Sequence, residues 1–338
     1  MKAWEIRDAF GLDHLVLAER ADAPLGAGQI RLRMSCASLN FRDSLMVRGG
    51  YNPKQGLPLV PCSDGVGVVE EVGAGVSRVR VGDRVSPIFA QKWLGGEPTH
   101  AKLRSTLGGP LDGTLAEHLV LSEEGVVHVP SHLTDEQAAT LPCAALTAWN
   151  ALTGYTPVKA GDVVLVQGTG GVSIFALQLA KMLGCQVIAT SSSEDKLERV
   201  RALGADHTIN YATQREWGKV ARDLTGGAGV DNIVEVGGAG TLAQSLRAIR
   251  IGGQISLIGV LAGNQQDLNI NPIFMQAVRV QGILVGHRES FEAMNRAIAL
   301  HRLVPVVDRA YAFGEARAAF EALAKSQLFG KLCIRIGA

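Results

Sequence analysis

Hydrophobic and polar positions follow two different patterns along the chain. In the first third, apolar residues alternate with polar ones or form short valine-rich runs cut by glycine, as in residues 30–40, 66–88 and 115–130. Runs of this kind, bounded by glycine turns, are typical of β-strands. We therefore expect a compact, β-rich, barrel-like domain over residues 1–122, with a surface loop at residues 91–113, where glycines and prolines cluster.

The pattern changes after residue 122. Residues 134–152 read as a helix, with Thr134 as N-cap and Gln137 three residues later in a capping box. Apolar strand-like runs then alternate with helical patterns, the strands falling at residues 162–167, 186–191, 206–211, 230–237 and 252–260. Strand–helix alternation specifies a parallel sheet with helices on both faces. We expect such a doubly wound α/β domain over residues 123–268.

Composition narrows the class of protein. A chain of 338 residues is long enough for two domains. Lys plus Arg is 33 and Asp plus Glu is 32, so the chain lacks the basic field of a nucleic-acid-binding protein. No apolar run is long enough for a membrane span. Five scattered cysteines exclude a disulfide framework, and a reduced, cytoplasmic compartment is expected.

The strongest motif is a glycine loop that follows the strand at residues 162–167. Its residues are Gly168, Thr169, Gly170, Gly171 and Val172, and an apolar helix follows. The first glycine permits the tight turn, and the next lets the backbone approach a pyrophosphate at the helix N-terminus. The third glycine of the fingerprint is replaced by Ser173. Because the loop lies within a strand–loop–helix–strand unit, it predicts dinucleotide binding.

The end of the second strand bears on which nicotinamide cofactor is bound. NAD-binding domains place a carboxylate there for the ribose hydroxyls. Here the strand ends in hydroxyl residues, and the predicted contacts to a 2′-phosphate are Ser191, Ser192, Lys196 and Tyr211. An alternative makes Ser193 only the N-cap of the next helix and Lys196 a solvated charge, and Glu194 and Asp195 complicate the local charge. The pattern favours NADPH over NADH.

A series of ordered motifs resembles the medium-chain dehydrogenase/reductase superfamily, in particular its zinc-free quinone oxidoreductase-like branch. The resemblance covers essentially the whole chain. It is carried by SLNFRD (38–43), GGYNP (49–53), LVPCSDGVGVVEEVGAGV (59–76), VGDRV (81–85), LPCAALTAWNAL (141–152), QGTGGVS (167–173), TSSSEDKL (190–197), LGADHTINY (203–211) and the C-terminal GK (330–331).

The resemblance implies a GroES-like catalytic domain, built from the N-terminal part and the C-terminal tail, with a Rossmann domain inserted between them. Residues 269–338 would then be a return segment that completes the sheet edge and the catalytic domain. It also implies a homodimer, paired through the edge of the Rossmann sheet near residues 278–285. An exposed apolar edge strand is an aggregation hazard, so pairing there has a physical reason.

The chain departs from the zinc-dependent members of this superfamily. They have a Cys where this chain has Asn40, and a GHE motif where it has Cys62, Ser63 and Asp64. Only Cys143 matches a catalytic zinc ligand, and the cysteines of the family's structural zinc lobe are missing from residues 91–113. A catalytic zinc needs three protein ligands and an open position. We expect no metal, although an unusual site of Cys62, Asp64 and Cys143 is a conceivable alternative.

Without zinc, the expected reaction is hydride transfer from NADPH to a small quinone or α,β-unsaturated carbonyl, whose conjugation spreads the developing charge. The resemblance implies two catalytic residues. Asn40 would donate a hydrogen bond to the substrate oxygen, and Tyr51 would donate a proton. A turn-stabilising role for Asn40 and a packing role for Tyr51 are the alternatives. Asp43 is expected to cap the helix that starts after Asn40, and holding Arg42 is the alternative.

Further cofactor contacts are expected from Thr147, Val260, Leu261 and Lys331. Two other functions remain open for the same chain. One is an alcohol dehydrogenase of simple alcohols that uses an unusual metal site. The other is an NADPH-binding sensor or scaffold with little turnover.

Overall fold

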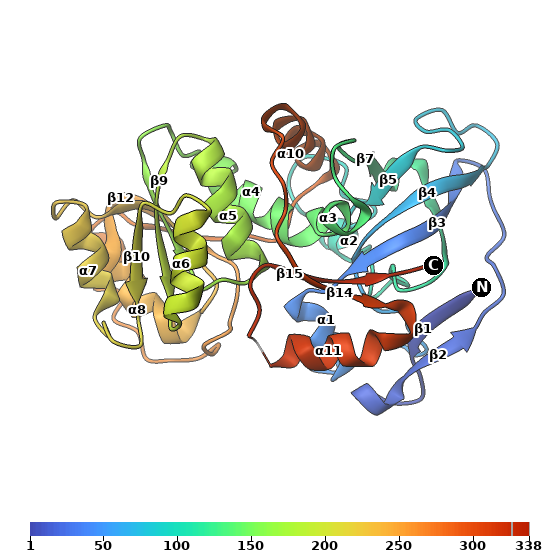
Figure 1. Cartoon of the computed structure of the whole chain (residues 1–338), viewed down its shortest axis with the longest axis horizontal. Coiled ribbons are helices and arrows are strands. Elements are labelled where there is room, and N and C mark those ends of the chain that lie inside the picture. Colours follow the sequence, from blue (N-terminus) through green and yellow to red (C-terminus); the bar gives the residue numbers. More distant parts are fainter. Residues whose placement is uncertain (326, 338) are drawn as a thin grey trace. The chain divides into compact units, whose positions relative to one another are not determined.

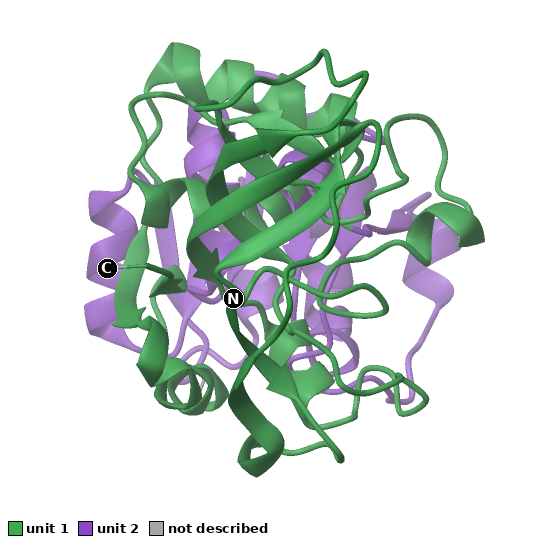
Figure 2. Ribbon diagram, turned by 90° about the vertical axis from the view of Figure 1, so that its right-hand side faces the viewer, with its two compact units in different colours: residues 1–146, 285–338 green, residues 147–284 purple. Residues whose placement is uncertain are grey.

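The computed structural model describes residues 1–325 and 327–337. They divide into two units, coloured separately in Figure 2. Unit 1 comprises Met1–Leu146 and Val285–Ala338, and unit 2 comprises Thr147–Leu284. We expected domain boundaries after residues 122 and 268, whereas the structure divides after residues 146 and 284. The reason is strand pairing, because residues on both sides of each expected boundary share a sheet.

Unit 2 contains the predicted doubly wound parallel sheet. Its order is β10 (His207–Asn210), β9 (Gln186–Ser191), β8 (Val163–Gln167), β11 (Val230–Glu235), β12 (Ile249–Leu257) and β13 (Arg279–Gly282), and all neighbours are parallel. The chain runs outward from β8 in one direction and from β11 in the other. The order therefore reverses between these two strands, which is where open α/β sheets bind ligands beyond their carboxyl ends.

The helices of unit 2 are α4 (Leu146–Thr153), which begins at the last residue of unit 1, α5 (Gly171–Met182), α6 (Glu194–Ala202), α7 (Trp217–Leu224), α8 (Ala239–Ala248) and α9 (Asn271–Met275) (Figure 1). Apolar residues of the central strands form part of the hydrophobic core of unit 2. Leu165, Ile188 and Ile233 pack with Trp217 of α7 and Leu246 of α8 in one buried cluster. Helices α7 and α8 thus share one face of the sheet.

Unit 1 is β-rich, as predicted. Strands β1 (Lys2–Ile6) and β2 (Leu15–Glu19) form an antiparallel pair. A seven-stranded sheet contains β14 (Val307–Ala312), β15 (Lys331–Arg335), β3 (Gln29–Ser38), β4 (Asp64–Val72), β5 (Arg84–Pro87) and β7 (Val126–His128) in that order, with β6 (His118–Ser122) paired to β3. The C-terminal strand β15 lies antiparallel to β3, so strands from the first and last parts of the sequence share one sheet (Figure 1).

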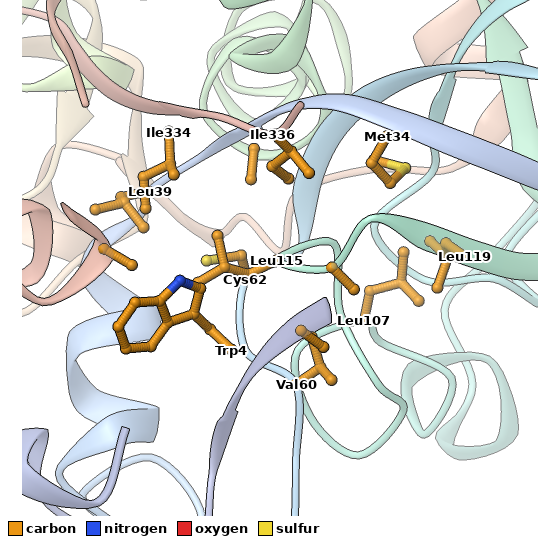
Figure 3. Close-up of a cluster of buried hydrophobic side chains, with 14 of the residues drawn as sticks. Trp4, Met34, Leu39, Val60, Cys62, Leu107, Leu115, Leu119, Ile334 and Ile336 are labelled. Carbon is orange, nitrogen blue, oxygen red and sulfur yellow. The ribbon is translucent and has the colours of Figure 1, made fainter. Parts of the chain in front are cut away.

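The core of unit 1 lies between these sheets and the helices that cover them. Alternate residues of β3, among them Ile30, Leu32 and Met34, are buried in it. Figure 3 shows the cluster, in which Cys62 lies among apolar side chains that include Trp4 and Leu115. Short 3₁₀ turns occur at Leu12–His14, Glu123–Gly125 and Phe313–Glu315.

The helices of unit 1 are α1 (Phe41–Val47), α2 (His100–Leu103), α3 (Asp135–Ala139), α10 (Arg288–His301) and α11 (Ala316–Ala324). The predicted capping box is confirmed, because the Thr134 hydroxyl accepts the Gln137 N–H and the Gln137 side chain accepts the Thr134 N–H. The single helix expected over residues 134–152 is wrong. A π-helical turn, Leu141–Ala145, separates α3 from α4, with Pro142 at its start.

The segment 91–113 is only partly the expected surface loop. It contains α2, and the stretch from Ser105 to Gly109 is buried, whereas residues 110–112 are exposed. None of the helices in the described parts of the chain is long and apolar enough to cross a membrane.

Candidate active site

Strand pairing in unit 1 brings residues from three distant parts of the sequence side by side, namely from strands β3, β4 and β15. Ser38, at the end of β3, is opposite Asp64 of β4 on one side and Cys333 of β15 on the other. The first residue of β15, Lys331, therefore lies beside the junction of β3 and α1. Its Nζ donates hydrogen bonds to Leu39 O and Asn40 Oδ1, both at 2.5 Å.

Asn40 is held at its backbone as well as at its side chain. It is the N-cap of α1, and its N–H donates to Asp43 Oδ2 at 2.8 Å, which confirms the expected capping role of Asp43. Its Nδ2 is buried and makes no hydrogen bond of normal geometry in the described parts of the chain, although the Asn40 amide also lowers the pKa of Asp64, which places this donor on the side of that carboxyl group. An unsatisfied buried donor costs about 1–3 kcal/mol, so a ligand that supplies an acceptor atom here gains that amount.

Asp64 is the buried anion of this cluster. It is 0% exposed; its Oδ1 accepts the Ser63 hydroxyl at 2.7 Å, and its Oδ2 accepts the Cys143 N–H at 3.2 Å. Lys331 Nζ lies 3.9 Å from Oδ2. Burial raises the pKa of Asp64, and the adjacent Lys331 ammonium and Asn40 amide oppose that rise.

A second buried acid–base pair lies next to the first. Asp43 is fully buried, and burial raises its pKa to about 6 although the Arg42 guanidinium, 3.9 Å away, favours the charged form. Arg42 Nη1 donates to Leu107 O at 2.8 Å and Nη2 donates to Gly109 O at 3.1 Å. The buried stretch 105–109 thus supplies carbonyl acceptors to both terminal nitrogens of this arginine, whereas its buried Nε has no partner in the described residues.

Tyr51 adjoins this pair through its ring. The Arg42 guanidinium carbon lies 4.8 Å from the centroid of the Tyr51 ring and 4.9 Å from that of Phe89. Tyr51 is 46% exposed, so one side of its ring packs on a cation while the rest remains accessible. The structure therefore brings Asn40 and Lys331 into direct contact and joins Tyr51 to the same neighbourhood through Arg42.

The donor set of this cluster does not fit a catalytic zinc ion. Lys331 Nζ is 2.5 Å from Asn40 Oδ1 and 3.9 Å from Asp64 Oδ2, so a dication beside Asp64 would meet an ammonium group. Cys62 packs in the apolar core. Within residues 1–325 and 327–337, no three His, Cys, Asp or Glu side chains are grouped to hold a metal, which includes the alternative set of Cys62, Asp64 and Cys143.

The glycine loop of unit 2 has the conformation that its motif predicts. Gly168 has a φ of +70°, and its N–H donates to Thr190 O at 2.8 Å. Gly170 is the N-cap of α5, and a Cβ added there would meet no atom within 4 Å. Ser173 replaces the third glycine at no polar cost, because its hydroxyl donates to Gln167 O at 2.6 Å. The loop with Thr169, Gly171 and Val172 leads into the N-terminus of this twelve-residue helix.

The predicted 2′-phosphate contacts lie at the carboxyl ends of β9 and β10. Asn210 is opposite Ser191 in the sheet, and the Tyr211 N–H donates to Ser191 O at 3.1 Å. Ser192 is exposed. The Ser193 hydroxyl accepts the Lys196 N–H at 3.4 Å, which confirms Ser193 as the N-cap of α6.

Two acidic groups border these contacts. Glu194 Oε1 accepts the Asn210 amide at 2.5 Å, and Asp195 is exposed beside it in the first turn of α6. Lys196 is half-buried in the next position.

Sequence reasoning missed a buried carboxylate at the switch point of the sheet. Glu235 ends β11 and is 0% exposed. Its two oxygens accept hydrogen bonds from the N–H groups of Gly237 and Gly238, the hydroxyls of Thr241 and Ser245, and the amide of Gln167. Gln167 is the residue before Gly168, so Glu235 links the carboxyl end of β11 to that of β8. The acidic residue was visible in the sequence, but its partners were not.

The remaining predicted contacts are placed as follows. Val260 and Leu261 are exposed in the turn after β12, and the Leu261 N–H donates to Val236 O at 3.2 Å. Thr147 is buried on α4. Lys331 is 3% exposed and its ammonium is occupied within unit 1, so this placement gives its predicted role as a cofactor contact no support.

Two family models match the chain. The model of the alcohol dehydrogenase GroES-like domain matches residues 26–131, and the model of the zinc-binding dehydrogenase matches residues 171–299. A zinc-type alcohol dehydrogenase-like protein of Schizosaccharomyces pombe is 41% identical over 318 residues, covering 92% of each chain. The chain therefore belongs to the zinc-type alcohol dehydrogenase-like proteins of the medium-chain dehydrogenase/reductase superfamily, which are oxidoreductases.

Two further similarities bear on the branch. A 2-haloacrylate reductase of a Burkholderia species is 34% identical over 265 residues, which is 77% of this chain and 73% of the relative. The crystal structure of an NAD-dependent alcohol dehydrogenase superposes with a TM-score of 0.92 at 34% identity, over the full length of both chains. The GroES-like and Rossmann fold expected from the sequence is confirmed by these matches.

Proposed function

We propose that this protein is a nicotinamide-dependent reductase that transfers hydride to a quinone or an α,β-unsaturated carbonyl compound and does not use a catalytic zinc. The observation that carries the proposal is the buried Nδ2 donor of Asn40, whose amide oxygen accepts a hydrogen bond from the Lys331 ammonium group. A fixed amide donor stabilises charge on a conjugated oxygen, where the negative charge is already spread over several atoms. The similarity to a 2-haloacrylate reductase supports an activated alkene as the acceptor.

The bound nicotinamide would supply the hydride. The protein's own residues hold the reactants: the loop from Gly168 to Val172 would bind the pyrophosphate at the N-terminus of α5. Asn40 Nδ2 would donate a hydrogen bond to the acceptor oxygen. Tyr51 would supply the proton that accompanies the hydride, so that one hydride and one proton are added to each acceptor.

NADPH is the proposed donor because hydroxyl groups, rather than a carboxylate, end β9. Ser191, Ser192, Lys196 and Tyr211 would hold the 2′-phosphate. Lys196→Ala is expected to raise KM for NADPH more than KM for NADH. Equal effects on both cofactors would remove the 2′-phosphate assignment.

The test of the function is an acceptor screen with purified protein after chelation, in which NADPH and NADH oxidation are followed in parallel. We expect turnover with quinones and activated alkenes, including a 2-haloacrylate, and no loss of activity with the chelator. Zinc-stimulated oxidation of simple alcohols would instead support the alcohol dehydrogenase alternative. Tight NADPH binding without oxidation by any acceptor would support the sensor or scaffold alternative.

A further inference from the structure

The side chain of Lys331 carries a buried ammonium group that is surrounded by three polar acceptor atoms. Its side chain is 3% exposed, and it enters from the first residue of β15, at the far end of the sequence from its partners. It has three N–H groups, and three acceptors adjoin it: Leu39 O at 2.5 Å, Asn40 Oδ1 at 2.5 Å and Asp64 Oδ2 at 3.9 Å. A buried charge is tolerated only when it is paired and hydrogen-bonded in this way.

This contact determines how the Asn40 amide is presented. An ammonium group has only donors, so the atom of Asn40 that faces it must be the carbonyl oxygen. The amide nitrogen is then directed away from Lys331. Because the Asn40 N–H is also bonded to Asp43, neither the backbone nor the side chain can rotate without breaking a buried hydrogen bond.

Lys331 also balances the charge of the cluster. Asp43 and Asp64 are both fully buried, and the buried cations next to them are Arg42 and Lys331. Arg42 is committed to the carbonyl groups of Leu107 and Gly109, so Lys331 is the cation that contacts the Asn40 side chain.

We propose that Lys331 is a positioning residue of the reductase site: its ammonium fixes the Asn40 amide with Nδ2 as the donor offered to the substrate oxygen, and occupies with a fixed single charge the place where a metal cation would have to bind. This role rests on the proposed function for its kinetic consequences, but the orientation of the amide does not depend on turnover. It differs from the cofactor contact expected from the C-terminal GK motif.

The kinetic test is a double-mutant cycle between Lys331→Met and Asn40→Ala. Each single variant is expected to lower kcat by about 10- to 100-fold, as for the loss of one preorganised hydrogen-bond donor. The double variant should be no slower than the slower single variant within about 2-fold, because both changes remove the same interaction. The Kd for NADPH, measured by fluorescence titration, should change less than about 3-fold.

Lys102→Met is the matched control. The Lys102 ammonium also donates to two backbone carbonyl groups, those of Gly95 and Glu97, but outside the cluster. Its kcat should stay within about 2-fold of the wild-type value. If Lys331→Met fails to fold, Lys331→Gln retains a donor for Leu39 O without the charge and should give the same non-additivity with Asn40→Ala.

Two kinetic results would overturn the proposal. One is a loss of NADPH affinity with unchanged kcat, which would make Lys331 a cofactor contact. The other is multiplicative effects of the two changes, which would show that they act independently.

A structural test separates this proposal from the proposed function. Crystal structures at about 1.2 Å resolution or better, where the amide O and N can be told apart, should show Oδ1 of Asn40 facing Nζ in the wild-type protein and a rotated amide in Lys331→Met. An unrotated amide in the variant would refute the positioning role. If the wild-type protein reduces no acceptor, the proposed function fails, and these two structures alone decide the role of Lys331.

Discussion

Unit 1 contains charged side chains that are buried away from solvent. Asp43, Asp64, Arg42 and Lys331 are all buried within a short stretch of strand and helix ends. The cost of burying each charge is offset by backbone carbonyl and N–H groups as much as by the opposite charges. Replacing one of these residues therefore leaves a specific polar atom without its partner, so single substitutions can test the role of each residue.

The raised pKa of Asp43 predicts a pH-dependent contribution to stability. Burial raises this pKa to about 6 in the folded protein from 3.8 in the unfolded chain. Between these values the folded state binds a proton that the unfolded state releases, so the contribution to the free energy of unfolding grows as pH falls. From pH 7 to pH 5 it should increase by about 1.4 kcal/mol. Urea unfolding of wild type and Asp43→Asn at both pH values measures the difference.

Asp83 supplies the control with the opposite sign. Its hydrogen bond with His128 lowers the pKa of the Asp83 carboxyl group, so its contribution to stability is lost as pH falls through the lowered value. The carboxyl group of Asp83 therefore adds no pH dependence of the Asp43 kind between pH 7 and pH 5, and its contribution should be lost only as the pH falls below 3.8. A pH-independent difference between wild type and Asp43→Asn would contradict the prediction.

Glu235 is the residue on which the switch point of unit 2 depends. Glu235→Ala leaves the Gly238 N–H without its acceptor and removes one acceptor each from the Gly237 N–H, the Gln167 amide and two hydroxyl groups, which should lower the free energy of unfolding by about 3–5 kcal/mol. Ser245→Ala removes one hydrogen bond from the same carboxylate and should cost only about 1 kcal/mol. Chemical unfolding measures both. Equal effects of the two changes would show that Glu235 does not organise this network.

At the scale of elements, the join between β8 and α5 carries the dinucleotide motif. Positions 168 and 170 of this loop differ in whether the fold itself needs a glycine there. Gly168 has a positive φ, which a side chain disfavours, whereas Gly170 has an ordinary φ of −75° and free space where a Cβ would be. The folded chain alone therefore does not need glycine at position 170. A ligand that approaches the backbone there would need it.

Gly170→Ala is therefore predicted to weaken NADPH binding while leaving the stability of the fold unchanged. The Tm should change by less than about 2 °C, since nothing in the fold opposes the added methyl group. The Kd for NADPH should rise at least about 10-fold, because the methyl group would lie where the backbone approaches the pyrophosphate. Gly314→Ala, which also meets no neighbouring atom, is the control and should alter neither quantity. Unchanged NADPH affinity of Gly170→Ala would argue against this loop as the pyrophosphate site.

Elements were predictable where local pattern and packing agree. Strand–helix alternation predicted the parallel, doubly wound sheet of unit 2, and the capping box at Thr134 predicted the start of α3. The π-helical turn at Leu141–Ala145 was not predictable, because the residues around Pro142 have the apolar pattern of one continuous helix. The buried stretch 105–109 was also missed, since its carbonyl groups are satisfied by Arg42, a partner more than sixty residues away in the sequence.

At the scale of the whole molecule, contacts between distant segments escape local reasoning. The sequence pointed to Asn40 and to the C-terminal GK motif separately. Only the pairing of β15 with β3 joins Lys331 to Asn40, across a separation of 291 residues. The resemblance to a family supplied the return of the C-terminal tail to the first domain, which periodicity does not contain. The ion pairs and hydrogen bonds inside the site could be identified only from the three-dimensional structure.

The edge of the sheet in unit 2 is the feature from which we predict a homodimer. Strand β13 pairs with β12 on one side, and its other edge is the end of the sheet. Helix α9, just before it, exposes Phe274 at 64% and Met275 at 74%. An unprotected edge with apolar side chains beside it favours pairing with a second copy of the chain. The protein should therefore sediment at twice its chain mass of 35.7 kDa.

The dimer is tested by placing charge on this surface. The double variant Phe274→Asp, Met275→Asp should sediment as a monomer at micromolar concentration, because two carboxylates would have to be desolvated in an apolar contact. Leu300→Asp is the control: Leu300 is 80% exposed on α10 of unit 1, so the variant should remain dimeric. A wild-type monomer would refute the dimer itself. A dimer that survives the double variant but dissociates with Leu300→Asp would move the interface from the β13 edge to α10.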